Sequence, residues 1–194
     1  MFSDPNLTVK LSFLALILCL SVRVSSARPA EIILLRHAEK PPEDSNTRLS
    51  TQGKERAHAL VQFLTTTPAL AQHGMPVALF ATQTTPRGHS YRTRETLEPL
   101  AQNLKLPIRT PYPAKDVAAL AKRILREPAY DGKTVVICWV HDYLPELAEA
   151  LGVKPKPAAW KHKVFDRVWV ITYPDKEASL KNLPQKLLPG DARN

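Results

Sequence analysis

The chain has 194 residues, a length typical of one domain, and its 44% hydrophobic content argues against a disordered protein. Its formal net charge is +9 at pH 7, but the basic residues are scattered along the sequence rather than gathered into a run or interleaved with aromatic residues. This distribution argues against nucleic acid as a partner, and it leaves an anionic surface, a small anionic substrate or simply a solvated basic surface.

The first 27 residues are expected to be a targeting segment rather than part of the fold. Lys10 precedes an apolar stretch at 11–22, and residues 25–27 are small, as a signal peptidase requires. This stretch is too short to span a bilayer, which takes about 20 apolar residues. We therefore expect a signal peptide cleaved near Ala27 and an exported domain at 28–194, periplasmic or secreted and free of the membrane. An uncleaved N-terminal anchor is the alternative.

The stretch from Glu31 to Lys40 carries the most specific signal in the mature chain. Residues 32–35 are four consecutive aliphatic residues, a pattern typical of a strand buried on both faces within a parallel sheet. The run ends at Arg36 and His37, and the two prolines after Lys40 cannot continue a strand. Open α/β sheets bind ligands at the carboxyl ends of their strands, so a cation beside a possible nucleophile indicates an anion, above all a phosphate.

Helical and strand patterns alternate along the rest of the chain. Apolar stripes with helical spacing lie at 57–64, 97–104, 117–124 and 144–151, strand patterns lie at 77–81, 134–140 and 165–173, and a weaker one lies at 107–110. Pro99 falls within the second helix, where we expect a kink or a late start. The charged tail from about residue 175 is expected to be loosely packed. The alternation predicts one three-layer α/β/α domain with a largely parallel central sheet.

Polar residues follow three of the predicted strands. Arg36 and His37 follow the first strand, the arginine-containing segment 91–96 follows the second after a loop, and His141 and Asp142 follow the strand at 134–140. Because the carboxyl ends of parallel strands lie at one edge, we expect two histidines and one or two arginines to meet there. Arginines bind phosphate oxygens bidentately, and a neutral imidazole can attack phosphorus when a hydrogen bond holds its other nitrogen.

Four segments resemble the motifs of the histidine phosphatase superfamily, also called the phosphoglycerate-mutase-like proteins. They are LLRHAEK (34–40) with LSTQGKERA (49–57), then RTRETLEPLA (92–101), VVICWVH (135–141) and FDRVWV (165–170). The segments occur in the order found in the family and cover nearly all of the mature chain. The resemblance therefore implies the phosphoglycerate-mutase-like form of the three-layer fold.

The resemblance also implies a role for four residues. His37 would be the nucleophile and pass through a phosphohistidine, Arg36 and Arg92 would bind the phosphate, and His141 would complete the pocket as a hydrogen-bond donor. Arg92 is preferred to Arg94 because it preserves the family spacing to the Glu-Thr pair that follows. No metal and no cofactor is required.

The resemblance leaves the general acid open among three carboxylates. Asp142 directly follows the second histidine, as in the acid-phosphatase branch of the family, and its alternative role is to cap the helix that begins at Tyr143. Glu39, next to the nucleophile, is the second candidate. Asp116, which also fits a helix cap, is the third. The mutase branch carries a glutamate in an inserted segment that has no equivalent here, which argues against mutase activity.

For residues outside this set we expect roles at the rim of the site or at the surface. Arg87, His89 and Lys40 are candidates for the rim that contacts the substrate. His162 lies in a predicted loop and is expected to be a solvated surface residue.

Together these features predict an exported phosphatase that hydrolyses phosphate monoesters through His37. Its partner would be a small phosphorylated substrate rather than nucleic acid. The alternative is a non-catalytic phosphate-binding or regulatory domain of the same fold. The sequence carries no signal for the oligomeric state.

Overall fold

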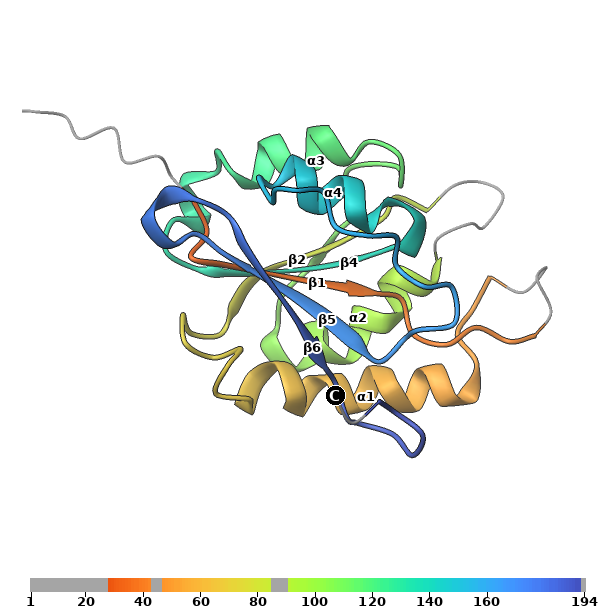
Figure 1. Ribbon diagram of the computed structural model, residues 1–194. Helices are drawn as coiled ribbons and strands as arrows, with labels where there is room; N and C mark the ends of the chain where they lie inside the picture. The colour runs from red at the N-terminus through yellow and green to blue at the C-terminus, as the bar shows by residue number, and fades with distance from the viewer. Residues whose placement is uncertain (1–27, 43–46, 85–90, 193–194) are drawn as a thin grey trace, which may run out of the picture.

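In the computed structural model of the chain, a central sheet is covered by helices on both faces (Figure 1). The structure describes residues 28–42, 47–84 and 91–192. The predicted targeting segment at 1–27 and the rim candidates Arg87 and His89 lie outside these residues. Within the described ranges, no helix combines the length and the apolar character needed to cross a membrane.

The described residues form one six-stranded sheet with the strand order β3-β2-β4-β1-β5-β6. The strands are β1 (Glu31–Arg36), β2 (Pro76–Ala81), β3 (Ile108–Arg109), β4 (Thr134–Trp139), β5 (Arg167–Thr172) and β6 (Ser179–Pro184). Strands β1 to β4 run parallel to one another, whereas β5 is antiparallel to β1 and β6 is antiparallel to β5. The sheet is therefore largely parallel, as predicted, with an antiparallel portion built by the end of the chain.

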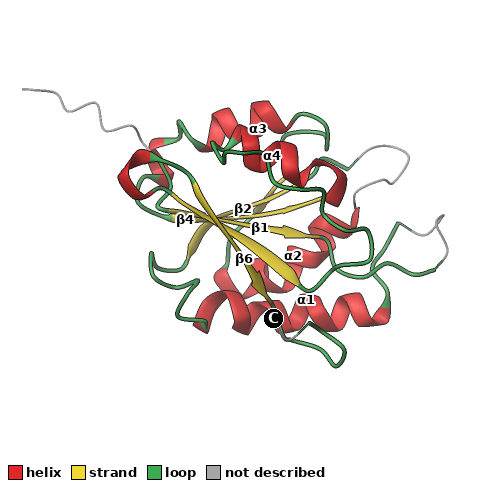
Figure 2. Cartoon of the chain, viewed as in Figure 1, coloured by secondary structure: helices red, strands yellow, loops and turns green. Residues whose placement is uncertain are grey.

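Helices form one layer on each face of this sheet (Figure 2). They are α1 (Thr51–Thr66), α2 (Tyr91–Leu104), α3 (Val117–Ile124) and α4 (Leu144–Ala150), together with the short 3-10 helices η1 (Pro128–Tyr130), η2 (His141–Tyr143) and η3 (Pro174–Lys176). Helix α1 packs with α2, and α3 packs with α4. This arrangement confirms the three-layer α/β/α prediction.

Two hydrophobic cores, one on each face of the sheet, explain the aliphatic run in β1. Ile32 and Leu34 pack in the core that includes α3 and α4, whereas Ile33 and Leu35 pack in the core that includes α1 and α2. All four side chains are fully buried, because β1 lies between β4 and β5 and is covered on both faces. The residues that follow β1, beginning with His37, therefore extend directly from a central strand that is buried on both faces.

Pro99 neither delays nor ends the second helix. Helix α2 begins at Tyr91 and continues past Pro99 to Leu104, so the expected late start is wrong. The proline removes one backbone donor, but the buried face of α2, which includes Leu97 and Leu100, holds the helix against the sheet.

The tail beyond residue 175 is packed, contrary to the prediction. Strand β6 pairs with β5 along its whole length, and the buried Gln185 donates a hydrogen bond from its amide to the carbonyl of Arg167. Leu180 and Leu183 are half-buried against opposite cores. A strand at the edge of a sheet is partly solvated and tolerates charged residues, so its composition resembles that of a loop.

Candidate active site

The four residues with predicted roles in phosphate chemistry meet at the carboxyl edge of β1 and β4. Arg36 is the last residue of β1, and the backbone N–H of His37 donates to the carbonyl of Trp139 at the end of β4. His141 begins η2 directly after β4, and Arg92 lies in the first turn of α2. The positive charges of Arg36 and Arg92, and that of His141 when protonated, all act on His37.

The His37 imidazole is buried and held in its neutral form. Its side chain is 4% exposed, and its Nδ1 lies 2.7 Å from the carbonyl oxygen of Ala38. A carbonyl oxygen only accepts hydrogen bonds, so Nδ1 carries the hydrogen and Nε2 carries a lone pair. Burial, reinforced by the charges around the ring and opposed by the Ala38 hydrogen bond, lowers the pKa of His37 to about 3. The imidazole is therefore unprotonated, with Nε2 available, throughout the physiological pH range.

Helix α2 links the residues that follow β1 to Arg92. The backbone N–H of Ala38 donates to Oγ1 of Thr96 (2.9 Å), and this hydroxyl donates to the carbonyl of Arg92 (2.7 Å). Glu95 accepts a hydrogen bond from the backbone N–H of Leu49 (2.8 Å). Residues 92, 95 and 96 share one side of the helix because they are spaced three and four apart. The Arg-x-x-Glu-Thr spacing thus fixes Arg92 and the loop after β1 together.

Arg94 lies elsewhere on α2. Its guanidinium is half-exposed and lies 3.6 Å from the carboxylate of Glu98, one turn along the helix. Arg92 is thus the arginine of this segment that faces the candidate site.

Arg36 is buried and held by the segment that precedes β5. Its Nη1 donates to the carbonyls of His162 and Val164, and its guanidinium carbon lies 3.9 Å from the centre of the Phe165 ring. Burial is the main cause that lowers the pKa of Arg36 to about 10, so it remains a cation at neutral pH. Its buried Nε has no hydrogen-bond partner among the described residues. Because an unsatisfied buried N–H is costly, a phosphate oxygen would complete this site.

His141 contacts a histidine that sequence reasoning missed. Its Nε2 lies 3.0 Å from Nδ1 of His162 and 3.3 Å from Oδ1 of Asp142. Burial and the charge of Arg36 are the main causes that lower the pKa of His141. His162 is exposed, as predicted for a loop residue, but one side of its ring faces the candidate site. Nothing in the local sequence marks this contact, because the two residues belong to different elements.

The three candidate acids lie in different surroundings. Asp142 is 71% exposed and contacts His141; the alternative that it caps the next helix is wrong, because Tyr143 occupies the cap position of α4. Glu39 binds Arg56 through both carboxylate oxygens, at 2.7 and 3.0 Å. Asp116 occupies the cap position of α3 without a side-chain capping hydrogen bond.

Arg56 is a second residue that sequence reasoning did not single out for a role. It is 2% exposed and binds Glu39, Asp191 and Gln185. These hydrogen bonds, and the charges of Glu39 and Asp191, outweigh burial and raise its pKa above the ordinary range. Arg56 therefore joins the loop after β1 to the tail of the chain, which makes its role structural.

A groove with a volume of about 680 Å³ adjoins the candidate site. Its walls include Lys40, Lys163, His162 and Phe165. Lys40 acts electrostatically on His141, and the Phe165 ring centre lies 6.0 Å from that of His37. The groove therefore lies directly beside His37 and His141 and has room for part of a ligand bound at the candidate site.

Comparisons with known proteins agree on the fold. Neither a protein-family model nor a curated protein sequence matches the chain. Among solved structures, the alpha-ribazole phosphatase from Shigella flexneri is similar with a TM-score of 0.57 and 15% identity over 79% of this chain and 96% of that one. The mycobacterial glucosyl-3-phosphoglycerate phosphatase, in complex with inorganic phosphate, gives 0.52 and 15% over 78% and 95%.

The phosphoglycerate mutase from Bacillus anthracis is similar over 81% of this chain and 94% of that one, with a TM-score of 0.52 and 13% identity. Identities this low carry information about the fold and not about the reaction. The order of the strands, the layers of helices and these three structures lead to one conclusion. This chain has the fold of the histidine phosphatase and phosphoglycerate-mutase-like proteins.

Proposed function

We propose that this chain is a phosphatase that hydrolyses phosphate monoesters through a phosphohistidine on His37. The observation that carries the proposal is the hydrogen bond from Nδ1 of His37 to the Ala38 carbonyl. It leaves Nε2 with a free lone pair, in a site surrounded by positive charge. The same fold in two proteins named as phosphatases supports the proposal at a coarse level.

In the first half-reaction, Nε2 of His37 attacks phosphorus and the bond from phosphorus to the leaving oxygen breaks. The imidazole becomes a phosphorylated imidazolium, and its Nδ1–H continues to donate to the Ala38 carbonyl, which stabilises the new positive charge. Arg36 and Arg92 bind the phosphoryl oxygens, with His141 as a further donor. Asp142, in its protonated form, gives its proton to the leaving oxygen.

In the second half-reaction, water attacks the phosphorus and the N–P bond breaks. The Asp142 carboxylate takes a proton from the water, inorganic phosphate leaves, and His37 returns to its neutral form. The choice of Asp142 rests on its contact with His141. By contrast, both carboxylate oxygens of Glu39 are bound to Arg56.

The leaving group of the substrate would lie in the groove beside Lys40 and Lys163. The two lysines bring positive charge to the groove, and the Glu39 carboxylate in the same wall is balanced by Arg56. Coulombic attraction therefore favours a small phosphorylated substrate whose leaving group carries a negative charge.

A non-catalytic phosphate-binding domain is the second candidate. The observation that favours it is the exposure of Asp142, whose side chain is 71% exposed and so is not held in one orientation by packing. Such a protein would bind phosphate through Arg36 and Arg92 but would not release an alcohol from an ester.

The proposed enzyme is exported, with residues 1–27 acting as a signal peptide cleaved near Ala27. Sequencing the amino terminus of the protein recovered outside the cytoplasm tests cleavage. A chain that retains its first residues and sediments with membranes would favour the anchor instead.

The test of the chemistry is His37→Asn, which removes the nucleophile and keeps a polar side chain. We expect turnover of an aryl phosphate to fall by at least about 10³-fold, because the variant lacks the Nε2 lone pair that attacks phosphorus. Wild-type protein should also acquire an acid-labile phosphate that the variant lacks. His58→Asn, at an exposed position of α1, is the matched control. Full activity in His37→Asn would contradict the mechanism, and labelled phosphate that binds without ester cleavage would favour the second candidate.

A further inference from the structure

We propose that His162 is a positioning residue for His141, which holds the imidazole ring and fixes which of its two nitrogens carries the proton. The proposal rests on the proposed function, in which His141 donates a hydrogen bond to the phosphate. It concerns a residue that the sequence motifs do not include, because His162 lies between the fourth strand pattern and the last.

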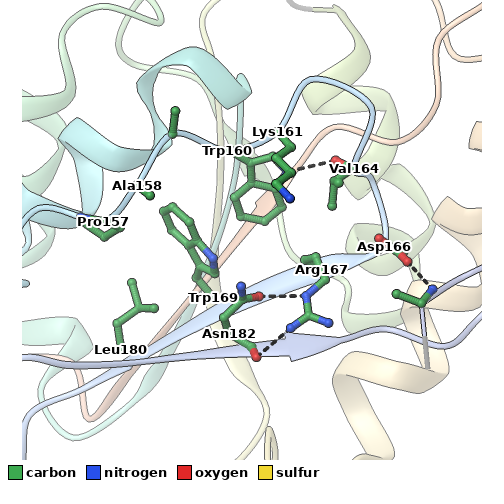
Figure 3. A pocket seen from close by; sticks show the side chains of 12 residues that line it. Pro157, Ala158, Trp160, Lys161, Val164, Asp166, Arg167, Trp169, Leu180 and Asn182 are labelled. Carbon is green, nitrogen blue, oxygen red and sulfur yellow. Dashed lines mark hydrogen bonds between the residues drawn. The ribbon is translucent and has the colours of Figure 1, made fainter. Parts of the chain in front are cut away.

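His162 belongs to a turn that is held against the sheet by buried aromatic residues. The backbone N–H of Val164 donates to the carbonyl of Lys161 (3.0 Å) and closes the turn. The indole of Trp160 donates to the carbonyl of Val164 (2.8 Å), as Figure 3 shows, and its ring centre lies 4.7 Å from that of Trp169 on β5. Trp160 and Trp169 are each 6% exposed. The turn is thus fixed to the sheet by a buried pair of aromatic rings.

The side chain of Arg36, which binds phosphate in the proposed mechanism, also holds this turn through hydrogen bonds. The carbonyls of His162 and Val164 both accept hydrogen bonds from Nη1 of Arg36, whose guanidinium lies over the ring of Phe165. The backbone of His162 therefore has a defined position relative to β1. From that position its side chain reaches His141, at the end of β4.

The short distance between the rings of His141 and His162 requires a hydrogen bond between two of their nitrogens. Nδ1 of His162 and Nε2 of His141 lie 3.0 Å apart, a distance at which one nitrogen carries a hydrogen and the other a lone pair. A neutral imidazole has one N–H, so the partner at Nε2 decides whether Nδ1 of His141 is a donor. The charged and titratable groups that act on His141 are Arg36, Asp142, His162 and Lys40.

His162 is better placed than Asp142 to set the tautomer of His141. Asp142 also lies near Nε2, but at 3.3 Å and with a side chain that is 71% exposed, so water competes for its oxygens. The exposed carboxylate cannot hold the ring in place, whereas the anchored turn can. Loss of His162 should therefore leave His141 with a mixture of tautomers and a looser ring.

The first arm of the test is a nitrogen NMR measurement on the histidine rings of the full chain. We expect one pyrrole-like and one pyridine-like signal for His141 in the wild type, with the signals identified by their loss in His141→Asn. In His162→Ala the two signals should move towards an average, because the tautomers then exchange. Unchanged signals for His141 in His162→Ala would overturn the proposal.

The second arm separates the hydrogen bond from the packing of the ring. His162→Asn keeps a hydrogen-bonding group near the position of Nδ1, whereas His162→Phe keeps a ring and removes the nitrogen. We expect kcat/KM for an aryl phosphate to stay within about threefold in His162→Asn and to fall about tenfold in His162→Phe, the size typical of one lost hydrogen bond. Equal activity in the two variants would contradict the proposal.

An NMR titration of the His141 ring gives a readout that a purely structural role would not change. The charge of protonated His162 lowers the pKa of His141, so His162→Phe should raise that pKa and move the titration of the His141 ring signals to higher pH. His73→Asn, at an exposed position of the described chain, is the matched control and should leave the His141 titration in place. An unmoved His141 titration in His162→Phe would count against the proposal. If the wild type shows no turnover, the proposed function fails, while the NMR arm still tests the contact.

Discussion

Glu31 at the amino end of β1 and His37 directly after its carboxyl end are buried titratable residues, and burial shifts their pKa values in opposite directions. Loss of water lowers the pKa of His37 to about 3 and raises that of Glu31 to about 7, in both cases because the charged form is disfavoured. For His37 the neutral form is the one that has the lone pair at Nε2. For Glu31 the neutral form has no chemical use, and its Oε1 has no hydrogen-bond partner among the described residues. Burial therefore serves the site at one end of β1 and costs stability at the other.

The surroundings of Arg92 and Arg94 make them a matched pair for mutation. Arg92→Ala removes a cation that acts on both His37 and Arg36, and we expect kcat/KM to fall by about a hundredfold or more. Arg94→Ala removes a half-exposed partner of Glu98 and should change kcat/KM by less than about twofold. Steady-state kinetics with an aryl phosphate measure both. A larger loss in Arg94→Ala would show that Arg92 does not bind the phosphate.

Glu31 makes the stability of the protein depend on pH. The unfolded chain releases the Glu31 proton near the ordinary value of 4.5, whereas the folded chain keeps it to about 7. The folded state therefore binds more protons in this window, and the free energy of unfolding falls as pH rises through it, by roughly 1–3 kcal/mol.

Glu31→Gln should remove this dependence, because an amide does not ionise. Relative to wild type, the variant should gain stability between about pH 4 and about pH 8, by the amount that the wild type loses. Urea unfolding at the two pH values measures the difference, and activity should be unchanged because Glu31 lies at the amino end of β1. The same difference between variant and wild type at both pH values would contradict the prediction.

The start of α1 shows how a helix fixes the loop that follows β1. A Cβ added to Gly53 would lie 2.3 Å from the carbonyl oxygen of Glu39, and that carbonyl also accepts a hydrogen bond from the backbone N–H of Ser50 (3.0 Å). Gly53→Ala gains about 1 kcal/mol of helix propensity. The overlap with backbone is costlier, because neither the helix nor the loop can move without breaking hydrogen bonds.

We therefore expect Gly53→Ala to be less stable than wild type by about 1–3 kcal/mol and to lose activity, because Glu39 follows His37 closely in the chain. Gln52→Ala, one residue earlier and exposed, controls for the change in helix propensity. Thermal unfolding and kinetics of the two variants measure the effect. A stabilised Gly53→Ala protein would mean that the two backbones are not held as close together as in this structure.

The elements whose apolar residues recur at a regular spacing could be predicted, because that spacing indicates which faces of the element are buried. The aliphatic run of β1 and the apolar stripes of α1 to α4 each indicate which faces are covered, and the motif order places Arg36, His37, Arg92 and His141 at one edge. His162 and Arg56 could not be found in this way. Their roles depend on contacts between elements far apart in the sequence, and a single polar residue in a loop or on a helix has no period. Strand β6 was not predicted for a related reason. It lies at the edge of the sheet, where partial exposure weakens the alternation of apolar and polar residues that marks a strand.

Across the whole domain, the buried side chain of Arg56 connects the tail of the chain to the loop that follows β1. Arg56 binds Glu39, two residues after His37, and Asp191, near the carboxyl end. Besides the Arg56 contacts, the carboxylate of Asp191 accepts hydrogen bonds from the backbone N–H groups of Leu187 and Leu188. Although burial opposes it, this bonding lowers the pKa of Asp191 to about 2. The ion pair is therefore intact above the ordinary carboxyl range and is lost only in strong acid.

Truncation after Glu177 should therefore destabilise the whole domain. It removes β6, exposes the edge of β5, and leaves Arg56 with Glu39 as its acidic partner. Breaking a buried ion pair costs about 3–5 kcal/mol, so we expect Tm to fall by about 10 °C or more. Asp191→Asn should reproduce part of the loss, and deletion of residues 193 and 194 alone is the matched control. A truncated protein with unchanged Tm would mean that the tail is loosely packed after all, and that Glu39 is held without the contribution of Asp191 to Arg56.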